Sequence, residues 1–250
     1  MKGWTVFGVM VGVWVSAWAV PSAEAHLRDY LVNQPYSTTE QAEFEVAVWN
    51  DMNFAEADND DTYTSKHQVE LEYGVTDHFQ FAYYEVYMWD RAKDWERDAF
   101  KIEAKVRFAE AGQWPLDVAL YTEYKNPDGH RDLRSDELEN KVILSKTMGS
   151  WNVVGNFVFE RKINTDSPWE HEYTAGVSYG VTPRTRIGLE VQQGLGTSEE
   201  FGGSDDQPLY LVPGIYASLT PHVRVLVGPA FGLTRVSDDL QLKSLVEIEF

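Results

Sequence analysis

The sequence of 250 residues contains no cysteine and is poor in positive charge, with 21 Lys and Arg against 40 Asp and Glu. Without cysteine no disulfide framework can form, so an exported chain of this kind must be held by packing or by a closed hydrogen-bond network. The formal net charge of −19 argues against a nucleic-acid partner, because such binding depends on neutralising phosphates. We therefore predict that the chain binds no nucleic acid.

Long apolar runs are also missing after the first 25 residues. Nothing beyond them approaches the ~18 apolar residues of a membrane helix, so this part of the chain could enter a membrane only as strands. The first residues, MKGWTVFGVMVGVWVSAWAVPSAEA, carry a positive charge at Lys2, an apolar stretch over 4–20 and small residues at Ala23 and Ala25. This order is typical of a secretory signal peptide, whereas a transmembrane anchor needs a longer span of ~20 residues. We predict a cleaved signal peptide over 1–25.

What the rest of the chain does contain is an apolar residue at nearly every second position. In FKIEAKVRF, residues 100–108, the even-numbered positions are apolar and the odd-numbered positions are charged. The same period recurs in KHQVELEYGV, TRIGLEVQ and VRVLVGPAF. A period of two indicates strands with two different faces. The sequence therefore predicts an all-β fold.

Short and long connections alternate between these runs. Three of the short ones, 73–78, 179–184 and 217–222, place Thr before Asp or Pro, as tight turns favour. The long ones are polar. The predicted strands, about twelve, are 40–52, 64–75, 79–90, 98–109, 116–126, 136–148, 151–163, 170–181, 185–196, 208–219, 223–233 and 241–250. Most are near the ~9–11 residues of a tilted membrane strand, whereas globular strands average about 5–6 residues.

Alternation alone does not say which face lies inside, because a soluble barrel with an apolar core has the same period. Four features favour a membrane barrel: the export signal, the even strand number with both termini on the short-turn side, the unequal connections, and aromatic residues near strand ends. Trp49 and Trp89 fall near long connections, and Trp114 and Trp151 near short turns. We predict a single transmembrane antiparallel up-and-down β-barrel over 40–250, preceded by a periplasmic N-terminal segment over 26–39.

The end of the chain supports the same interpretation. The final run, SLVEIEF, alternates up to a C-terminal aromatic residue, with Val246, Ile248 and Phe250 on one face. It resembles the β-signal that the barrel-insertion machinery reads in Gram-negative outer-membrane proteins. The whole mature chain resembles that general class, which includes porin-like channels. The resemblance implies a location in the cell outer membrane, with lipid, lipopolysaccharide and the insertion machinery as partners.

If the apolar face meets lipid, the polar face lines the lumen. The predicted lumen-lining residues are Glu70, Glu72, Lys101, Glu103, Lys105, Arg107, Glu123, Glu139, Glu160, Glu172, Arg186, Glu190 and Arg224. Acids outnumber bases among them, and carboxylates in a bore favour cations or neutral polar solutes over anions. We predict a narrow channel for passive passage of small polar or cationic solutes. The alternative is a non-conducting structural or surface-interaction barrel, in which the charges pair across the lumen.

No metal, cofactor or catalytic centre is predicted. The acidic connections near 56–61 and 199–206 lack the EF-hand spacing and are interpreted as solvated loops, and His26 has no visible partner ligand. Ser65 and His67 form the one Ser-His pair at a plausible spacing, but no third residue that orients the histidine can be named. A rim-sited lipid or ester hydrolase is therefore the least favoured alternative, and the chain is predicted not to be an enzyme.

Overall fold

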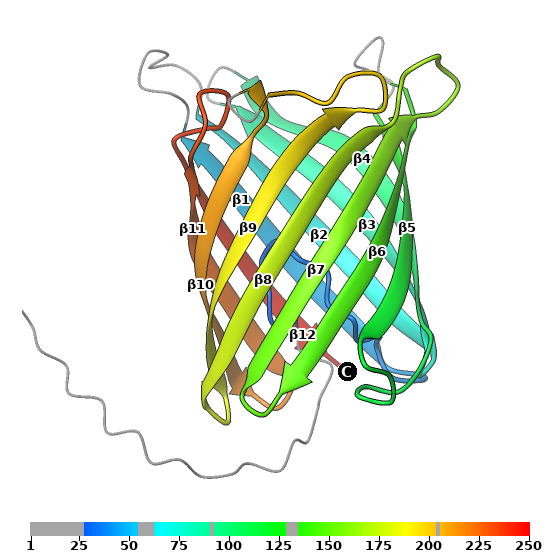
Figure 1. Ribbon diagram of the computed structural model, residues 1–250, viewed down its shortest axis with the longest axis vertical. Coiled ribbons are helices and arrows are strands. Elements are labelled where there is room, and N and C mark those ends of the chain that lie inside the picture. The colour runs from blue at the N-terminus through cyan, green and yellow to red at the C-terminus, as the bar shows by residue number, and fades with distance from the viewer. Residues whose placement is uncertain (1–27, 55–62, 91–92, 129–134, 204–205) are drawn as a thin grey trace, which may run out of the picture.

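The structure, a computed structural model, describes residues 28–54, 63–90, 93–128, 135–203 and 206–250. Over these residues the chain forms twelve strands that close into one barrel (Figure 1). They are β1 (Phe44–Phe54), β2 (Tyr63–Thr76), β3 (Phe79–Asp90), β4 (Lys93–Arg107), β5 (Asp117–Pro127), β6 (Glu137–Met148), β7 (Trp151–Lys162), β8 (Glu170–Thr182), β9 (Thr185–Thr197), β10 (Leu209–Thr220), β11 (Val223–Gly232) and β12 (Leu240–Glu249). Among the described residues, no helix is long and apolar enough to cross a membrane.

Each strand pairs antiparallel with its neighbours in sequence, and β12 returns to pair with β1. This confirms the predicted all-β, antiparallel, up-and-down barrel. Closure matters because an open sheet leaves one row of unpaired N–H and C=O groups at each edge, and a closed barrel leaves none.

The predicted strands agree with the observed ones to within a few residues, with two exceptions. β1 begins at Phe44 and not at residue 40, because Ala42 has a φ of 67° and residues 40–43 form a turn that bonds to Gly74. β4 begins at Lys93 and not at residue 98, since its first residues keep pairing with β3 across two register shifts. Both differences depend on hydrogen bonds to a neighbouring strand. The alternation within one stretch of sequence carries no information about such bonds.

The closing seam joins the first strand to the last. Val46 lies opposite Ile248, and Val48 opposite Val246. Beyond the last ladder pair, the Phe250 N–H donates to the Phe44 carbonyl over 2.8 Å. The predicted insertion-signal residues Val246, Ile248 and Phe250 lie on the outward face, and their role in insertion stays a prediction.

The two faces of the barrel wall differ in the way the period predicted. On β4, Ile102 is 47% exposed, whereas the next residue, Glu103, is fully buried. On β9, Leu189 is 43% exposed, and Glu190, which follows it, is fully buried. A soluble barrel would show the opposite arrangement, with apolar residues inside. The outer surface is mostly apolar, with an ion pair between Glu85 and Arg97 on it, and carboxylates such as Glu103 and Glu190 point inward.

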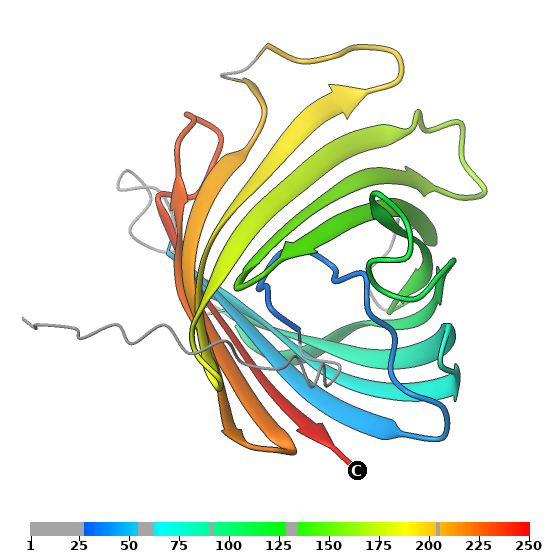
Figure 2. The same ribbon diagram turned by 60° about the horizontal axis from the view of Figure 1, so that its bottom comes forward.

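Residues 28–39, called the N-terminal segment below, lie inside the barrel (Figures 1 and 2). Arg28, Tyr30 and Leu31 are all less than 7% exposed. The segment packs toward the short-turn end, where Tyr30 joins a cluster with Ile143 and Leu31 one with Leu226. The sequence predicted 26–39 as a periplasmic N-terminal segment before the first strand, and this stays a prediction. Its place in the lumen was not predicted, and it follows from inward-facing groups of the wall that bond the backbone and side chains of the described part.

Candidate functional site

The carboxylate of Glu190, on β9, holds the middle of the N-terminal segment. Three consecutive backbone N–H groups donate to it: Leu31 to Oε1 over 2.7 Å, then Val32 and Asn33 to Oε2 over 2.8 and 2.9 Å. The side-chain amide of Asn33 adds a fourth bond of 2.9 Å, and the Tyr216 hydroxyl donates a fifth over 2.9 Å. Successive N–H groups around one anion form a nest, and bonds to an ionised acceptor are stronger than neutral ones. One buried side chain therefore fixes three residues of the segment.

Glycines in the wall leave room for the aromatic rings around this carboxylate. A Cβ at Gly188 or at Gly214 would lie 2.6 Å from the ring of Tyr216, and a Cβ at Gly176 would lie 2.7 Å from Tyr30. Real Cβ atoms do not approach so closely, so each ring lies flat along the wall only because these positions carry no side chain. The Tyr216 ring thereby brings its hydroxyl to Glu190.

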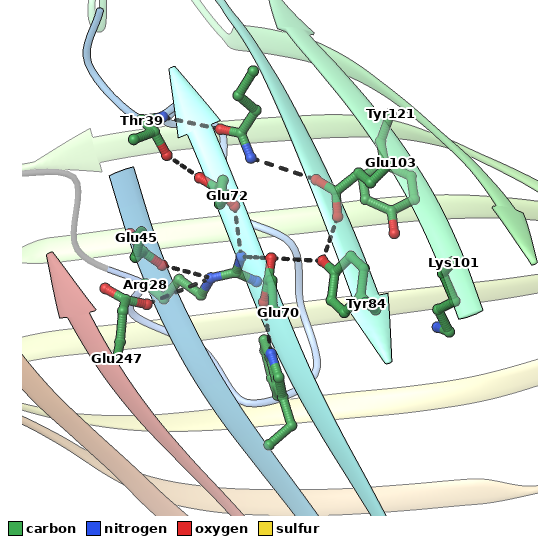
Figure 3. A network of polar contacts seen from close by, with 12 residues as sticks. Arg28, Thr39, Glu45, Glu70, Glu72, Tyr84, Lys101, Glu103, Tyr121 and Glu247 are labelled. Atoms are coloured by element: carbon green, nitrogen blue, oxygen red, sulfur yellow. Dashed lines mark hydrogen bonds and ion pairs between the residues drawn. The ribbon is translucent and has the colours of Figure 1, made fainter. Parts of the chain in front are cut away.

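The start of the segment carries the cation of a buried charge network (Figure 3). Arg28 Nη2 lies 2.5 Å from Glu70 Oε1 and 2.9 Å from Glu72 Oε2, and Arg28 Nε lies 3.5 Å from Glu247 Oε2 and 4.0 Å from Glu45 Oε1. All five side chains are at most 5% exposed. Burying a carboxylate is costly unless a cation or hydrogen-bond donors compensate it. Arg28 is the cation these four carboxylates share.

The network continues along the wall through hydroxyl and ring N–H donors. The Tyr84 hydroxyl bonds both Glu70, over 2.6 Å, and Glu103. The indole N–H of Trp49 donates to the second oxygen of Glu70 over 2.7 Å. Glu103 also accepts a longer bond of 3.4 Å from the Gln80 amide. The acids on β2 and β4 are thus linked to each other as well as to the segment (Figure 3).

The next residue of the segment makes the opposite kind of contact. Asp29 lies 2.5 Å from Arg224 on β11 and 3.1 Å from Arg186 on β9. Arg28 therefore contacts acids on one part of the wall, and the adjacent Asp29 contacts arginines on another part. This complementarity fixes the direction in which the segment enters the lumen.

Nearer the long connections, the charged side chains of the lumen pair with other side chains of the wall and not with the N-terminal segment. Lysines pair with carboxylates at 2.7 to 3.3 Å without any contribution from the N-terminal segment. The pairs are Lys101 with Glu123, Lys125 with Glu137, Lys141 with Glu139, and Lys243 with Asp51. These side chains are 7–25% exposed, so they are better hydrated than the Arg28 network.

The predicted lumen-lining residues differ in burial. The most deeply buried are Glu70, Glu72, Glu103, Lys105, Glu123, Glu190 and Arg224. The others are less buried: Lys101, Glu139, Glu160, Glu172 and Arg186. Arg107 ends β4, where it bonds Thr38 of the segment and Glu110 of the following turn. Whether these residues contact a permeating solute stays a prediction.

Sequence reasoning missed the residues that the N-terminal segment brings to the site. Arg28 and Asp29 were visible as a charged pair, but no period or motif linked them to the wall. Glu45 was also missed, although it lies within the predicted first strand, 40–52. Tyr84 and Tyr216 were visible only as strand-forming aromatics.

The outer face holds a second finding that sequence reasoning missed. Ser65 Oγ lies 2.9 Å from His67 Nε2, and His67 Nδ1 lies 2.7 Å from Asn50 Oδ1. Asn50 is on β1, directly opposite His67 of β2. The sequence named the first two residues but not the third, which only the register of β1 against β2 reveals.

The remaining candidates carry no site in the described residues. No group of three or more metal-binding side chains occurs among them. Asp206 forms an exposed pair with Arg235 at 2.9 Å. His26, the acidic connection at 56–61 and Asp205 lie outside the described residues.

Comparison with known proteins identifies the fold. No family model matches the sequence, and no curated protein matches it. The outer membrane channel COG4313 from Pseudomonas putida F1 is similar in structure, with a TM-score of 0.63 at 12% identity over 91% of this chain and 100% of that chain. The KdgM porin and the NanC porin each give 0.57 at 9% identity, over 82% of this chain and 98% of theirs. The chain therefore has the fold of outer-membrane channel barrels.

Proposed function

We propose that this chain is an outer-membrane channel that passes small polar or cationic solutes through a lumen narrowed by its own N-terminal segment. The observation that carries the proposal is the arrangement of the wall, with apolar side chains such as Ile102 and Leu189 exposed outside and carboxylates such as Glu103 and Glu190 inside. An exposed apolar surface of this extent suits a hydrocarbon environment, and a charged interior suits water. The fold it shares with three channel barrels supports the same function.

The preferred solute follows from the net charge of the residues that line the lumen. Glutamates outnumber lysines and arginines among the predicted lining residues. A permeating cation replaces part of its hydration with carboxylate oxygens, whereas an anion is repelled by them. The paired lysines near the long connections weaken this preference without reversing it.

The membrane setting supplies the partners of the proposal. The outer face would contact lipid and lipopolysaccharide, with exposed aromatics such as Trp114 and Trp151 at one rim. The outward-facing Val246, Ile248 and Phe250 would be read by the insertion machinery before the seam with β1 closes.

One observation favours a non-conducting barrel as the second candidate. The N-terminal segment is bonded at Arg28, Asp29, Leu31, Val32 and Asn33, so a large part of the short-turn half of the lumen is filled. If it never leaves, the barrel would serve as a structural or surface-interaction element.

Recording from the purified full chain in a planar bilayer separates the two candidates. A channel gives discrete current steps, and a salt gradient gives a reversal potential of the sign expected for cations. Protein that is folded by heat-modifiable gel mobility but silent in the bilayer would overturn the channel proposal and support the non-conducting barrel.

A further inference from the structure

The outer face of β1 and β2 themselves is mostly apolar and carries one chain of bonded polar side chains. Val48, Val69 and Leu71 are 38–39% exposed on this face. On the same face, Ser65, His67 and Asn50 are joined by contacts of 2.9 and 2.7 Å. A polar group facing hydrocarbon is unfavourable unless it is bonded. The lipid-facing side of a strand needs no such chain for stability.

The contacts assign each group a definite role. Asn50 Oδ1 can only accept a hydrogen bond, so His67 Nδ1 carries a proton and donates it. The Asn50 amide is placed with its Nδ2 toward Ser244 Oγ on β12, at 3.4 Å, and with its Oδ1 toward His67. In the neutral imidazole, Nε2 is then unprotonated and accepts the Ser65 hydroxyl proton over 2.9 Å.

This is the arrangement of a nucleophile, a general base and a residue that orients the base. Acyl-transfer enzymes on unrelated folds use the same geometry, with the third residue an aspartate, a glutamate or an asparagine. The rigid ladder between β1 and β2 sets it here, since His67 is paired with Asn50 and Ser65 with Met52.

The position of the three residues suggests the substrate. Ser65 is near the start of β2, at the end of the barrel that carries the long connections. The Trp95 ring lies 4.6 Å from the His67 ring and is 59% exposed, as an aromatic residue at the headgroup level would be. The acyl esters of membrane lipids lie next to that level, between the hydrocarbon and the headgroups.

We propose that Ser65, His67 and Asn50 form a second site, which hydrolyses acyl esters of membrane lipids at the outer face of the barrel. The proposal rests on the membrane location proposed above and is independent of conduction. Ser65 and His67 are the catalytic residues, and Asn50 is a positioning residue.

The chemistry is acyl transfer to serine followed by hydrolysis. Ser65 Oγ attacks the ester carbonyl carbon while its proton passes to His67 Nε2. The carbon–oxygen bond to the lipid alcohol then breaks, the alcohol takes the proton from Nε2, and the acyl group stays on Ser65. Water, deprotonated by the same nitrogen, releases the fatty acid and restores the serine. Ser65 is 3% exposed, so side chains around it must move before an ester reaches Oγ, and slow turnover is expected.

The test uses the full chain folded in phosphatidylcholine vesicles, with two readouts. The first is labelling by a fluorophosphonate probe, with the modified residue located by mass spectrometry. The second is release of fatty acid from the vesicle lipid. We expect an adduct on Ser65 and fatty-acid release that Ser65→Ala abolishes. His67→Asn should lower the release rate by about 10²- to 10⁴-fold, the usual contribution of a general base.

Asn50 and a neutral position on the same surface provide the controls. Asn50→Ala should lower the rate and shift its pH profile, whereas Asn50→Asp, which keeps an acceptor for Nδ1–H, should restore most of it. Thr122→Ala, on the outward face of β5, should change neither readout. Heat-modifiable gel mobility checks that every variant is folded.

Folded wild-type protein without an adduct on Ser65, or equal fatty-acid release by Ser65→Ala, would overturn the proposal. Hydrolysis of soluble p-nitrophenyl butyrate without hydrolysis of vesicle lipid would overturn the lipid assignment. A variant that loses hydrolysis but keeps wild-type conductance leaves the channel proposal standing, so the two proposals can fail separately.

Discussion

The two ends of the lumen carry the same kinds of charged groups and compensate them in different ways. Near the short turns, buried acids such as Glu70 and Glu190 are bonded by the N-terminal segment. Near the long connections, an acid such as Glu123 is paired with Lys101 on the neighbouring strand. A wall that pairs its own charges needs nothing in the lumen, whereas one with unpaired acids requires an inserted cation. The N-terminal segment is therefore expected to stabilise the short-turn half of the barrel and not the half near the long connections.

Removing the shared cation should have the largest effect. Arg28→Ala leaves four carboxylates around an empty position and is expected to lower the free energy of unfolding by about 3–5 kcal/mol, as for other broken buried ion pairs. The matched control is Arg235→Ala, whose pair with Asp206 is exposed and worth about 0–1 kcal/mol. Urea unfolding followed by tryptophan fluorescence compares them. Equal losses in the two variants would contradict the assigned role of Arg28.

Weakening the central anchor should have the next largest effect. Glu190→Gln keeps the shape but leaves a single neutral acceptor and turns the other carboxylate oxygen into an NH2 donor that faces donors, at an expected cost of about 2 kcal/mol. The segment should then leave its position more often, so single-channel current should show more frequent open steps. Glu172→Gln is the control, because the Glu172 carboxylate accepts a hydrogen bond of 3.0 Å from Gln192 on the neighbouring strand β9. Identical gating in both variants would show that Glu190 does not hold the segment.

Substitution in the long-connection half should alter selectivity more than stability. Lys101→Met removes a positive charge and frees the carboxylate of Glu123, so cation preference should increase. The reversal potential in a salt gradient measures this. Lys146→Met, at a lysine that bonds the Trp114 carbonyl in a short turn, should leave the potential unchanged. A shift toward anions with Lys101→Met would contradict the assignment of this half to the solute path.

The smallest effect is expected outside both halves, in the turn after β4. Hydrogen bonds from His78 and then from Arg107 hold the pKa of Glu110 below its ordinary value of about 4.3. A carboxylate with a lowered folded-state pKa stabilises the fold above its unfolded pKa, and this stabilisation is lost as the pH falls through the folded one. Glu110→Gln should lower stability slightly at neutral pH, and its difference from the wild type should shrink as the pH falls below about 4.3. A constant difference at all pH values would disprove the linkage.

The strands of this barrel could be predicted from sequence because their pattern is local. The alternation over 100–108 contains both the strand and its two faces. The position of the N-terminal segment could not be predicted, since it depends on contacts such as Leu31 with Glu190, far apart in the chain. The same limit applies to Asn50, whose place beside His67 follows from strand register and not from any motif.

A crosslink between the segment and the wall tests most directly whether the segment controls the lumen. Asn33 and Thr174 touch at 2.7 Å, and the chain has no native cysteine, so Asn33→Cys with Thr174→Cys gives a single pair for a short bismaleimide reagent. Single-channel current is recorded before and after the reagent, with Glu190→Gln added to the pair. The account predicts that the crosslink forms and returns the raised current to the wild-type level. Failure of the pair to crosslink in folded protein, or a raised current that the crosslink does not change, would contradict it.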